Sequence, residues 1–271
     1  MTADTKGTAL ITGASSGIGA VYAEELAQRG FDLILVARNI DRLAAVAEKL
    51  RATSGRTIDT VQADLNDGAD LRRIEAILRG DQRITMLVNN AGFGSAAPLL
   101  QADPDAMERM IGVNVTAVTR LAYAAAPAFA ARGHGAIINI ASTVAIIPEL
   151  LNGVYGASKA YVLAFTQSLQ HELASRGVRI QAVLPGATAT EFWNVAGVGG
   201  HQNLPAGIVM RTADLVAAAL AGFEAGEVVT IPPLEKGEAW TALEAARTAL
   251  SAQLGAASPA TRYGVGRSAA A

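Results

Sequence analysis

The stretch TGASSGIGA, residues 12–20, is the part of the sequence that decides the fold. It follows the apolar run TALIT at 8–12, which predicts a β-strand, and it leads into a helix-like segment at 17–29. Its three glycines let the backbone turn tightly and approach a pyrophosphate, whose charge the start of the helix then stabilises. Three glycines also fit an ordinary turn. Their position between a strand and a helix favours a nucleotide-binding loop.

Outward from this loop, short apolar runs alternate with longer helix-like segments. Further strands are predicted at 32–37, 58–63, 84–90, 136–142, 179–185 and 227–232, with helices between them at 40–53, 69–79, 104–131, 154–175 and 213–224. Strands that are apolar throughout and separated by helices are typical of a parallel sheet covered on both faces. The sequence therefore predicts an α/β fold, a Rossmann-type doubly wound parallel sheet of about seven strands.

Domain organisation follows from composition. No linker-like change divides the chain before residue 255, so we expect a single domain over 1–254. Within it, residues 187–211 break the alternation with several glycines and a proline, which predicts a lid. Residues 255–271 are rich in small side chains and lack periodicity, so we expect a disordered tail there.

The composition of the chain also restricts which partners the protein can bind and where in the cell it is expected. The net charge of −2 provides no basic field for nucleic acid or an anionic membrane. No apolar run reaches the ~20 residues that span a bilayer, and no secretory signal precedes the first strand. The chain has no cysteine, and no set of ligand-type residues has metal-binding spacing. We expect a cytoplasmic protein without bound metal that acts on a small molecule.

The end of the second predicted strand, VARN at 36–39, bears on the choice of cofactor. At this point the general fold uses a carboxylate to bind the adenosine ribose of NAD. Here Arg38 and Asn39 stand instead, and a guanidinium pairs well with a 2′-phosphate. The sequence favours NADP(H) over NAD(H), the alternative being that Arg38 is a solvated residue at the start of a helix.

The pentapeptide YGASK, residues 155–159, predicts the chemistry. Tyr155 and Lys159 are four residues apart and share a face of the predicted helix. Carbonyl reduction needs a hydride, which NADPH carries, and a proton, which the protein must supply. A phenol has a pKa of about 10, so a nearby ammonium and the positive cofactor ring would have to lower it by ~3 units. Tyr155 is the predicted general acid/base, although such a pair is also common on solvated helix surfaces.

Taken together, these motifs resemble the short-chain dehydrogenase/reductase family, in its NADP(H)-preferring branch, over about residues 7–231. The resemblance rests on the GxxxGxG spacing of the loop, on NNAG at 89–92, on PG at 185–186 and on the set Asn114, Ser142, Tyr155 and Lys159. It implies that Ser142 hydrogen-bonds the substrate carbonyl oxygen and that Asn114 lies in a distorted helix whose water links Lys159 to bulk solvent. The four residues form the catalytic set that the resemblance implies.

The same resemblance implies a cofactor-binding set. In it, Asp64 contacts the adenine amino group and Thr190 the nicotinamide carboxamide, with Thr188 as a competitor for that role. The whole set is Gly13, Ser15, Ser16, Gly17, Ile18, Gly19, Arg38, Asn39, Asp64, Leu65, Asn90, Ala91, Gly92, Tyr155, Lys159, Pro185, Gly186, Thr188 and Thr190.

The substrate pocket is expected to contain Ser142, Ile146, Phe192 and Trp193, which suggests an apolar or aromatic carbonyl compound. The two aromatic residues are equally suited to packing the lid. We predict an NADP(H)-dependent ketoreductase that works reversibly as an alcohol dehydrogenase and forms a homo-oligomer, a dimer or a tetramer. The alternatives are an NADP(H)-sensing regulatory protein without turnover and a sugar-nucleotide epimerase or dehydratase.

Overall fold

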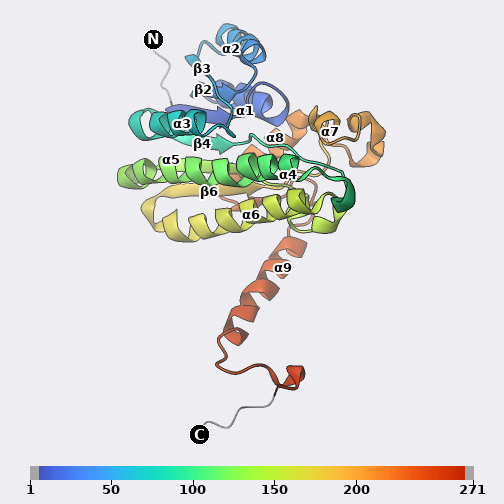
Figure 1. Ribbon diagram of the computed structural model, residues 1–271. Coiled ribbons are helices and arrows are strands. Elements are labelled where there is room, and N and C mark those ends of the chain that lie inside the picture. Colours follow the sequence, from blue (N-terminus) through green and yellow to red (C-terminus); the bar gives the residue numbers. More distant parts are fainter. Residues whose placement is uncertain (1–5, 266–271) are drawn as a thin grey trace. The chain divides into compact units, whose positions relative to one another are not determined.

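The computed structural model of the chain describes residues 6–265. Over these residues seven strands form one sheet in the order β3-β2-β1-β4-β5-β6-β7, and every neighbouring pair is parallel (Figure 1). The strands are β1 (Thr8–Thr12), β2 (Asp32–Ala37), β3 (Ile58–Gln62), β4 (Ile84–Asn89), β5 (Gly135–Ile140), β6 (Val178–Val183) and β7 (Val229–Thr230). This architecture confirms the predicted seven-stranded Rossmann-type fold.

Helices cover both faces of the sheet (Figure 1). One apolar core joins the sheet to α1 (Gly17–Gln28), α2 (Ile40–Ser54) and α8 (Thr212–Glu224), and a second core joins it to α3 (Gly68–Gly80), α5 (Val118–Arg132) and α6 (Gly153–Leu173). Successive side chains of a strand point to opposite faces, so Ile11 of β1 lies in the first core and Leu10 in the second. Both faces must then be apolar, which explains the uninterrupted hydrophobic strands.

The sheet reverses its order between β1 and β4, and this is where open α/β sheets bind ligands. Loops from the carboxyl ends of the strands meet at this edge. Thr12 at the end of β1 lies opposite Val36 of β2, and Asn89 at the end of β4 lies opposite Asn139 of β5. The predicted motifs that follow β1, β2, β3 and β4 are therefore neighbours in space.

The predicted helix at 104–131 is interrupted in the structure. Asp103 caps α4 (Pro104–Ile111) by accepting hydrogen bonds from two backbone N–H groups of the first turn. A π-helical stretch, Gly112–Ala117, then separates α4 from α5. Short π-helical insertions are rare and occur often at functional sites. Asn114 lies inside this one and is fully buried.

The chain divides into two compact units, whose described parts are residues 6–233 and 234–265. The second unit carries α9 (Glu238–Ala249), in which no residue is buried, and turns of 3₁₀ helix at Leu250–Gln253 and Thr261–Tyr263. Pro232 and Pro233, which follow β7 and cannot donate to a ladder, lie at this division. A single domain over 1–254 stays a prediction, as does the disordered tail, whose residues 266–271 lie outside the described part.

Candidate active site

Glycines shape the loop between β1 and α1. Gly13 and Gly17 have φ angles of +68° and +55°, a conformation that side chains other than hydrogen rarely permit. A Cβ atom on Gly13 would also lie 2.9 Å from the Cα of Ala91. Gly19 packs against the carbonyl oxygen of Gly13 and the side chain of Asn90. The glycines thus let the loop backbone lie close to a ligand at the start of α1, as phosphate binding requires.

Asn90 ties this loop to the end of β4. Its Nδ2 atom donates to the carbonyl oxygens of Thr12 at 2.9 Å and Gly13 at 3.2 Å. Its neighbour Asn89 donates to Asn139 Oδ1 at 2.9 Å, inside the sheet. The NNAG motif therefore joins the ends of β1, β4 and β5.

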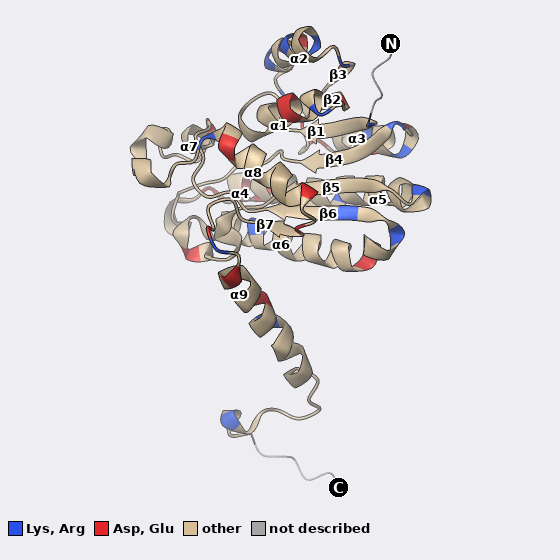
Figure 2. Cartoon of the chain, turned by 180° about the vertical axis from the view of Figure 1, so that it is seen from behind, with Lys and Arg blue, Asp and Glu red and all other residues tan. Residues whose placement is uncertain are grey.

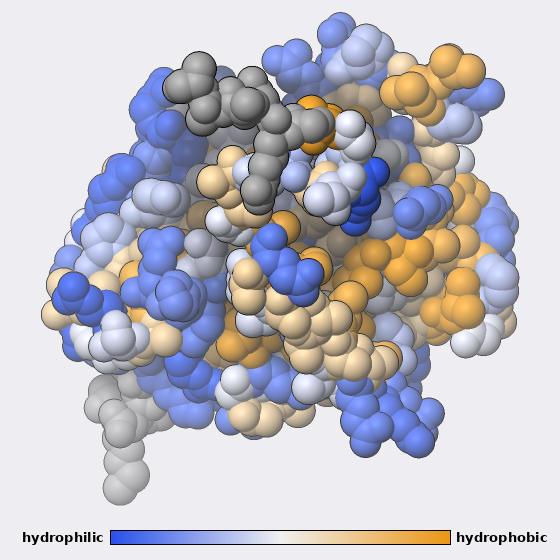
Figure 3. Space-filling view, turned by 90° about the horizontal axis from the view of Figure 1, so that it is seen from below, coloured by the Kyte–Doolittle hydropathy of each residue, from blue (hydrophilic) through white to orange (hydrophobic). Residues whose placement is uncertain are grey.

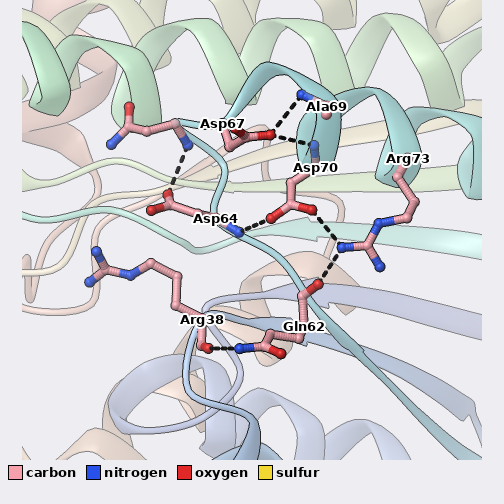
Figure 4. Close-up of polar contacts among 8 residues, drawn as sticks. Arg38, Gln62, Asp64, Asp67, Ala69, Asp70 and Arg73 are labelled. Atoms are coloured by element: carbon pink, nitrogen blue, oxygen red, sulfur yellow. Dashed lines mark hydrogen bonds and ion pairs between the residues drawn. The ribbon is translucent and has the colours of Figure 1, made fainter.

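A polar network holds the ends of β2 and β3 together (Figure 4). Gln62 Nε2 donates to the carbonyl oxygen of Arg38 at 3.0 Å, and the backbone N–H of Asp64 donates to Asp70 Oδ2 at 2.8 Å. Arg73 bridges these contacts by donating to the carbonyl oxygen of Gln62 and to Asp70 Oδ1. The two predicted adenosine contacts, Arg38 and Asp64, are thus fixed at the backbone by residues that sequence motifs did not single out.

The Arg38 side chain is exposed and lines the same cavity as the glycine loop. Within residues 6–265 no carboxylate or carbonyl oxygen pairs with its guanidinium, and Figure 4 shows it extended beside Asp64. Asn39 caps α2 by accepting a hydrogen bond from the backbone N–H of Arg42 at 2.9 Å. Arg38 is therefore a cation available to an anionic ligand.

The predicted catalytic side chains meet at the other end of the cavity. Tyr155 and Lys159 lie on α6 and are each 6% exposed, and Ser142 follows β5. Lys159 Nζ donates to the carbonyl oxygen of Ile140 at 2.8 Å and lies 5.9 Å from the centre of the Tyr155 ring. Ser142 Oγ, which donates to the carbonyl oxygen of Pro185 at 3.4 Å, lies near enough to the phenol to influence its pKa. The phenol and the serine hydroxyl can therefore both reach one substrate oxygen.

Burial controls the pKa values of this pair. Loss of hydration raises the pKa of Tyr155 to about 12, with the Ser142 hydrogen bond opposing the shift, and lowers the pKa of Lys159 to about 8. The phenol pKa is raised because Tyr155 packs among Met110, Val144 and Phe192, where a phenolate is poorly solvated. The lowering expected from Lys159 and the cofactor ring together stays a prediction. A positive charge brought into this site would act in the opposite direction.

Asn114 lies behind the catalytic pair and does not line the cavity. Its Nδ2 atom donates to the carbonyl oxygen of Phe93 at 2.9 Å and to Ser158 Oγ at 3.0 Å, and its Oδ1 accepts from the backbone N–H of Phe93 at 3.2 Å. A Cβ atom on Gly92 would lie 2.8 Å from Asn114 Oδ1 and 3.5 Å from Lys159 Nζ. The π-helical stretch therefore places Asn114 next to the lysine, and its role in proton supply stays a prediction.

The cavity has a volume of about 1000 Å³ and runs from Arg38 to Tyr155. Every residue of the predicted cofactor set lines it except Gly19, which packs beneath the loop. Ile146, predicted for the substrate pocket, does not line it. The apolar end of the cavity is instead formed by Phe93, Val113, Val144, Leu150, Leu151, Phe192, Trp193, Val195, Leu204 and Ile208.

The segment 187–211 forms one wall of the cavity and carries α7 (Phe192–Val195). The Phe192 ring lies 5.5 Å from the Tyr155 ring, centre to centre, and contacts Trp193 edge to face. Trp193 is buried, and its Nε1 donates to the carbonyl oxygen of Thr188 at 2.9 Å. These contacts favour a packing role for Trp193, whereas Phe192 forms the wall beside the phenol.

Comparison with known proteins places this geometry in a family. Residues 7–197 match the pattern described as short chain dehydrogenase. A short-chain dehydrogenase from Sphingobium yanoikuyae, solved in complex with NADPH, is 49% identical, with a TM-score of 0.92 over 95% of this chain and 99% of that one. The bulky-bulky ketone specific alcohol dehydrogenase from Comamonas testosteroni is 45% identical, with a TM-score of 0.88 over 96% of this chain and 99% of that one.

A human relative, 17-beta-hydroxysteroid dehydrogenase type 3, is 35% identical over 209 residues. The match covers 76% of this chain and 64% of that protein, so the chain spans less than two thirds of its length. Residues 7–197, which match the family pattern, include the glycine loop and the part of α6 that carries Tyr155 and Lys159. The chain therefore belongs to the short-chain dehydrogenase family.

Proposed function

We propose that the protein is an NADP(H)-dependent oxidoreductase that reversibly reduces a ketone or an aldehyde to an alcohol. The observation that carries this proposal is that Tyr155, Lys159 and Ser142 converge at one end of a single cavity whose other end is the glycine loop with Arg38. A protein that only senses the cofactor needs the glycine loop and Arg38, but no proton donor. A proton donor buried beside a lysine supports turnover.

The residues of the cavity fit NADP(H). The backbone at 13–17 would hold the pyrophosphate at the start of α1, and the exposed guanidinium of Arg38 would hold the 2′-phosphate. Asp64, whose Oδ1 also accepts the backbone N–H of Asn66 at 3.0 Å, would face the adenine. NADPH-bound relatives support the choice of cofactor. When bound, NADPH supplies the hydride.

The chain itself handles the proton. Ser142 Oγ hydrogen-bonds the carbonyl oxygen of the substrate and stabilises the negative charge that develops there. The Tyr155 hydroxyl transfers its proton to that oxygen, which the raised phenol pKa allows because the phenol remains protonated over the physiological range. The Lys159 ammonium, anchored on the Ile140 carbonyl oxygen, stabilises the phenolate that remains. In the oxidation direction Tyr155 accepts the proton.

We propose that the substrate is apolar and bulky on both sides of its carbonyl. Leu150, Val195 and Ile208 line the cavity and yet are each more than half exposed, which extends an apolar surface from the catalytic end to the outside. The space-filling view shows hydrophobic residues gathered on one side of the face seen from below (Figure 3). The bulky ketones named for the relative from Comamonas testosteroni support the same class.

A homo-oligomer, dimer or tetramer, is part of this proposal. Tyr123 of α5 is 66% exposed and stacks on Phe165 of α6, which also stacks on Tyr161. Such an exposed aromatic face supports an interface between copies. Figure 2 shows acidic and basic residues on the same side of the chain, seen from behind. Among residues 6–265 no helix is both long and apolar enough to cross a membrane, and the cytoplasmic location stays a prediction.

A panel of aldehydes and ketones of graded size tests this function. Purified protein is given each compound with NADPH and, separately, with NADH, and cofactor oxidation is followed by absorbance. We expect turnover of bulky apolar ketones with NADPH as the better cofactor. Tight NADPH binding without oxidation against any carbonyl would instead support a regulatory protein and contradict the proposal.

A further inference from the structure

An ion pair spans the cofactor cavity. Arg42 on α2 and Glu191 in the 187–211 segment both line the cavity, and the guanidinium Nη1 donates to Glu191 Oε2 at 2.6 Å. The two residues are 149 positions apart in the sequence. Between residues 6 and 265, no other ion pair joins two residues of the cavity lining.

Both partners are attached to parts of the site. Arg42 lies in the first turn of α2, whose cap Asn39 accepts its backbone N–H, and Arg38 precedes that cap. Glu191 directly precedes Phe192, the residue that packs against the Tyr155 ring. The pair therefore connects the adenosine end of the cavity with the wall of the catalytic end.

We propose that Arg42 and Glu191 form a clasp across the cofactor cavity that must open before the dinucleotide can leave. This inference rests on the proposed function, because it needs a dinucleotide in the cavity. The side chains are 53% and 57% exposed, so water can replace the contact readily. An exposed pair of this kind slows release rather than deciding affinity by itself, and we expect an effect of about two- to fivefold.

The way in which the 187–211 segment is held over the glycine loop supports the assignment of the clasp to Arg42 and Glu191. Thr190, next to Glu191, lies 3.4 Å from the position that a Cβ atom on Gly17 would take, so the segment passes directly over the glycine loop. Thr212 Oγ1 donates to the carbonyl oxygen of Ala189 at 2.8 Å and fixes the other side of the segment to α8. The segment is thus anchored to α8 through Thr212, and within residues 6–265 its one hydrogen bond or ion pair to α2 is that between Arg42 and Glu191.

The test is the rate of NADPH release, measured by stopped-flow fluorescence after mixing the complex with excess NADP⁺. Glu191→Gln keeps the shape of the side chain and removes its charge, and we expect release to become about two- to fivefold faster. In an Arg42→Gln background the same substitution should have no further effect, because the partner is already absent. High salt should reduce the difference between Glu191→Gln and the unchanged protein.

Asp214→Asn is the matched control. It removes the exposed Arg211–Asp214 pair, which lies at the end of the same segment but outside the cavity lining. We expect it to leave the release rate unchanged. Unchanged or slower release in Glu191→Gln, or an equal acceleration in Asp214→Asn, would overturn the clasp while leaving the proposed function intact. Failure of the unchanged protein to bind NADPH would contradict the proposed function, and the clasp with it.

Discussion

Replacement of Arg38 by alanine tests the cofactor assignment through a side chain whose removal leaves the fold undisturbed. The Arg38 guanidinium lines the cavity without a partner among the described residues, and only its backbone oxygen is held, by Gln62 at 3.0 Å. Hydrogen bonds to a charged group contribute about 1.5–3 kcal/mol. Because Arg38 is exposed to solvent, which screens the interaction, the lower value applies, and it corresponds to about a tenfold change.

The assay is the Michaelis constant of the Arg38→Ala variant for NADPH and for NADH with one ketone substrate. We expect the constant for NADPH to rise about tenfold and that for NADH, which lacks the 2′-phosphate, to stay nearly constant. Arg72→Ala, an exposed arginine of α3 outside the cavity lining, should change neither value. Equal effects of Arg38→Ala on both cofactors would refute the pairing of Arg38 with the 2′-phosphate.

Two further predictions concern buried titratable groups. Tyr22 is fully buried, its hydroxyl has no hydrogen-bond partner within the described residues, and burial raises its pKa. Tyr22→Phe should therefore raise the free energy of unfolding, measured in urea, by about 1 kcal/mol. A lower free energy of unfolding in this variant would show that the hydroxyl has a partner. Lys159 has a pKa of about 8 in the fold against 10.5 in a model peptide, so the unfolded chain binds more protons between these values and stability should rise with pH across that window. This rise in the free energy of unfolding is on the order of 3 kcal/mol and should be absent in Lys159→Met. If the free energy of unfolding of Lys159→Met depended on pH as that of the unchanged protein does, the lysine would not be desolvated.

The sequence predicts the frame of this site well because the frame depends on local patterns. Apolar runs of five or six residues define the central strands, and the loop glycines are needed for backbone conformations that can be anticipated from their place between β1 and α1. Parallel strands bring their carboxyl ends to one edge of the sheet, so the sequence alone places the motifs at 13–19, 89–92 and 185–186 near one another.

The remaining features depend on contacts between distant segments. The π-helical stretch at Gly112–Ala117 accompanies the hydrogen bonds of Asn114 with Phe93 and Ser158, which no helical periodicity reveals. The ion pair between Arg42 and Glu191 joins segments that are unrelated in sequence. The neighbour Lys159 is visible in the YGASK motif, whereas the burial of Tyr155 among Met110, Val144 and Phe192, which raises the pKa of the phenol, is not.

The central claim is that Tyr155 is the group that exchanges a proton with the carbonyl oxygen, and Tyr155→Phe tests it most directly. The substitution removes one hydroxyl and keeps the ring that packs against Phe192. We expect kcat for NADPH-dependent reduction to fall by at least about 100-fold, since a positioned general acid contributes about 10²–10⁴, while the Kd for NADPH measured by calorimetry stays within about threefold of the unchanged value. Turnover that survives within tenfold of the unchanged protein, with NADPH still bound, would contradict the account.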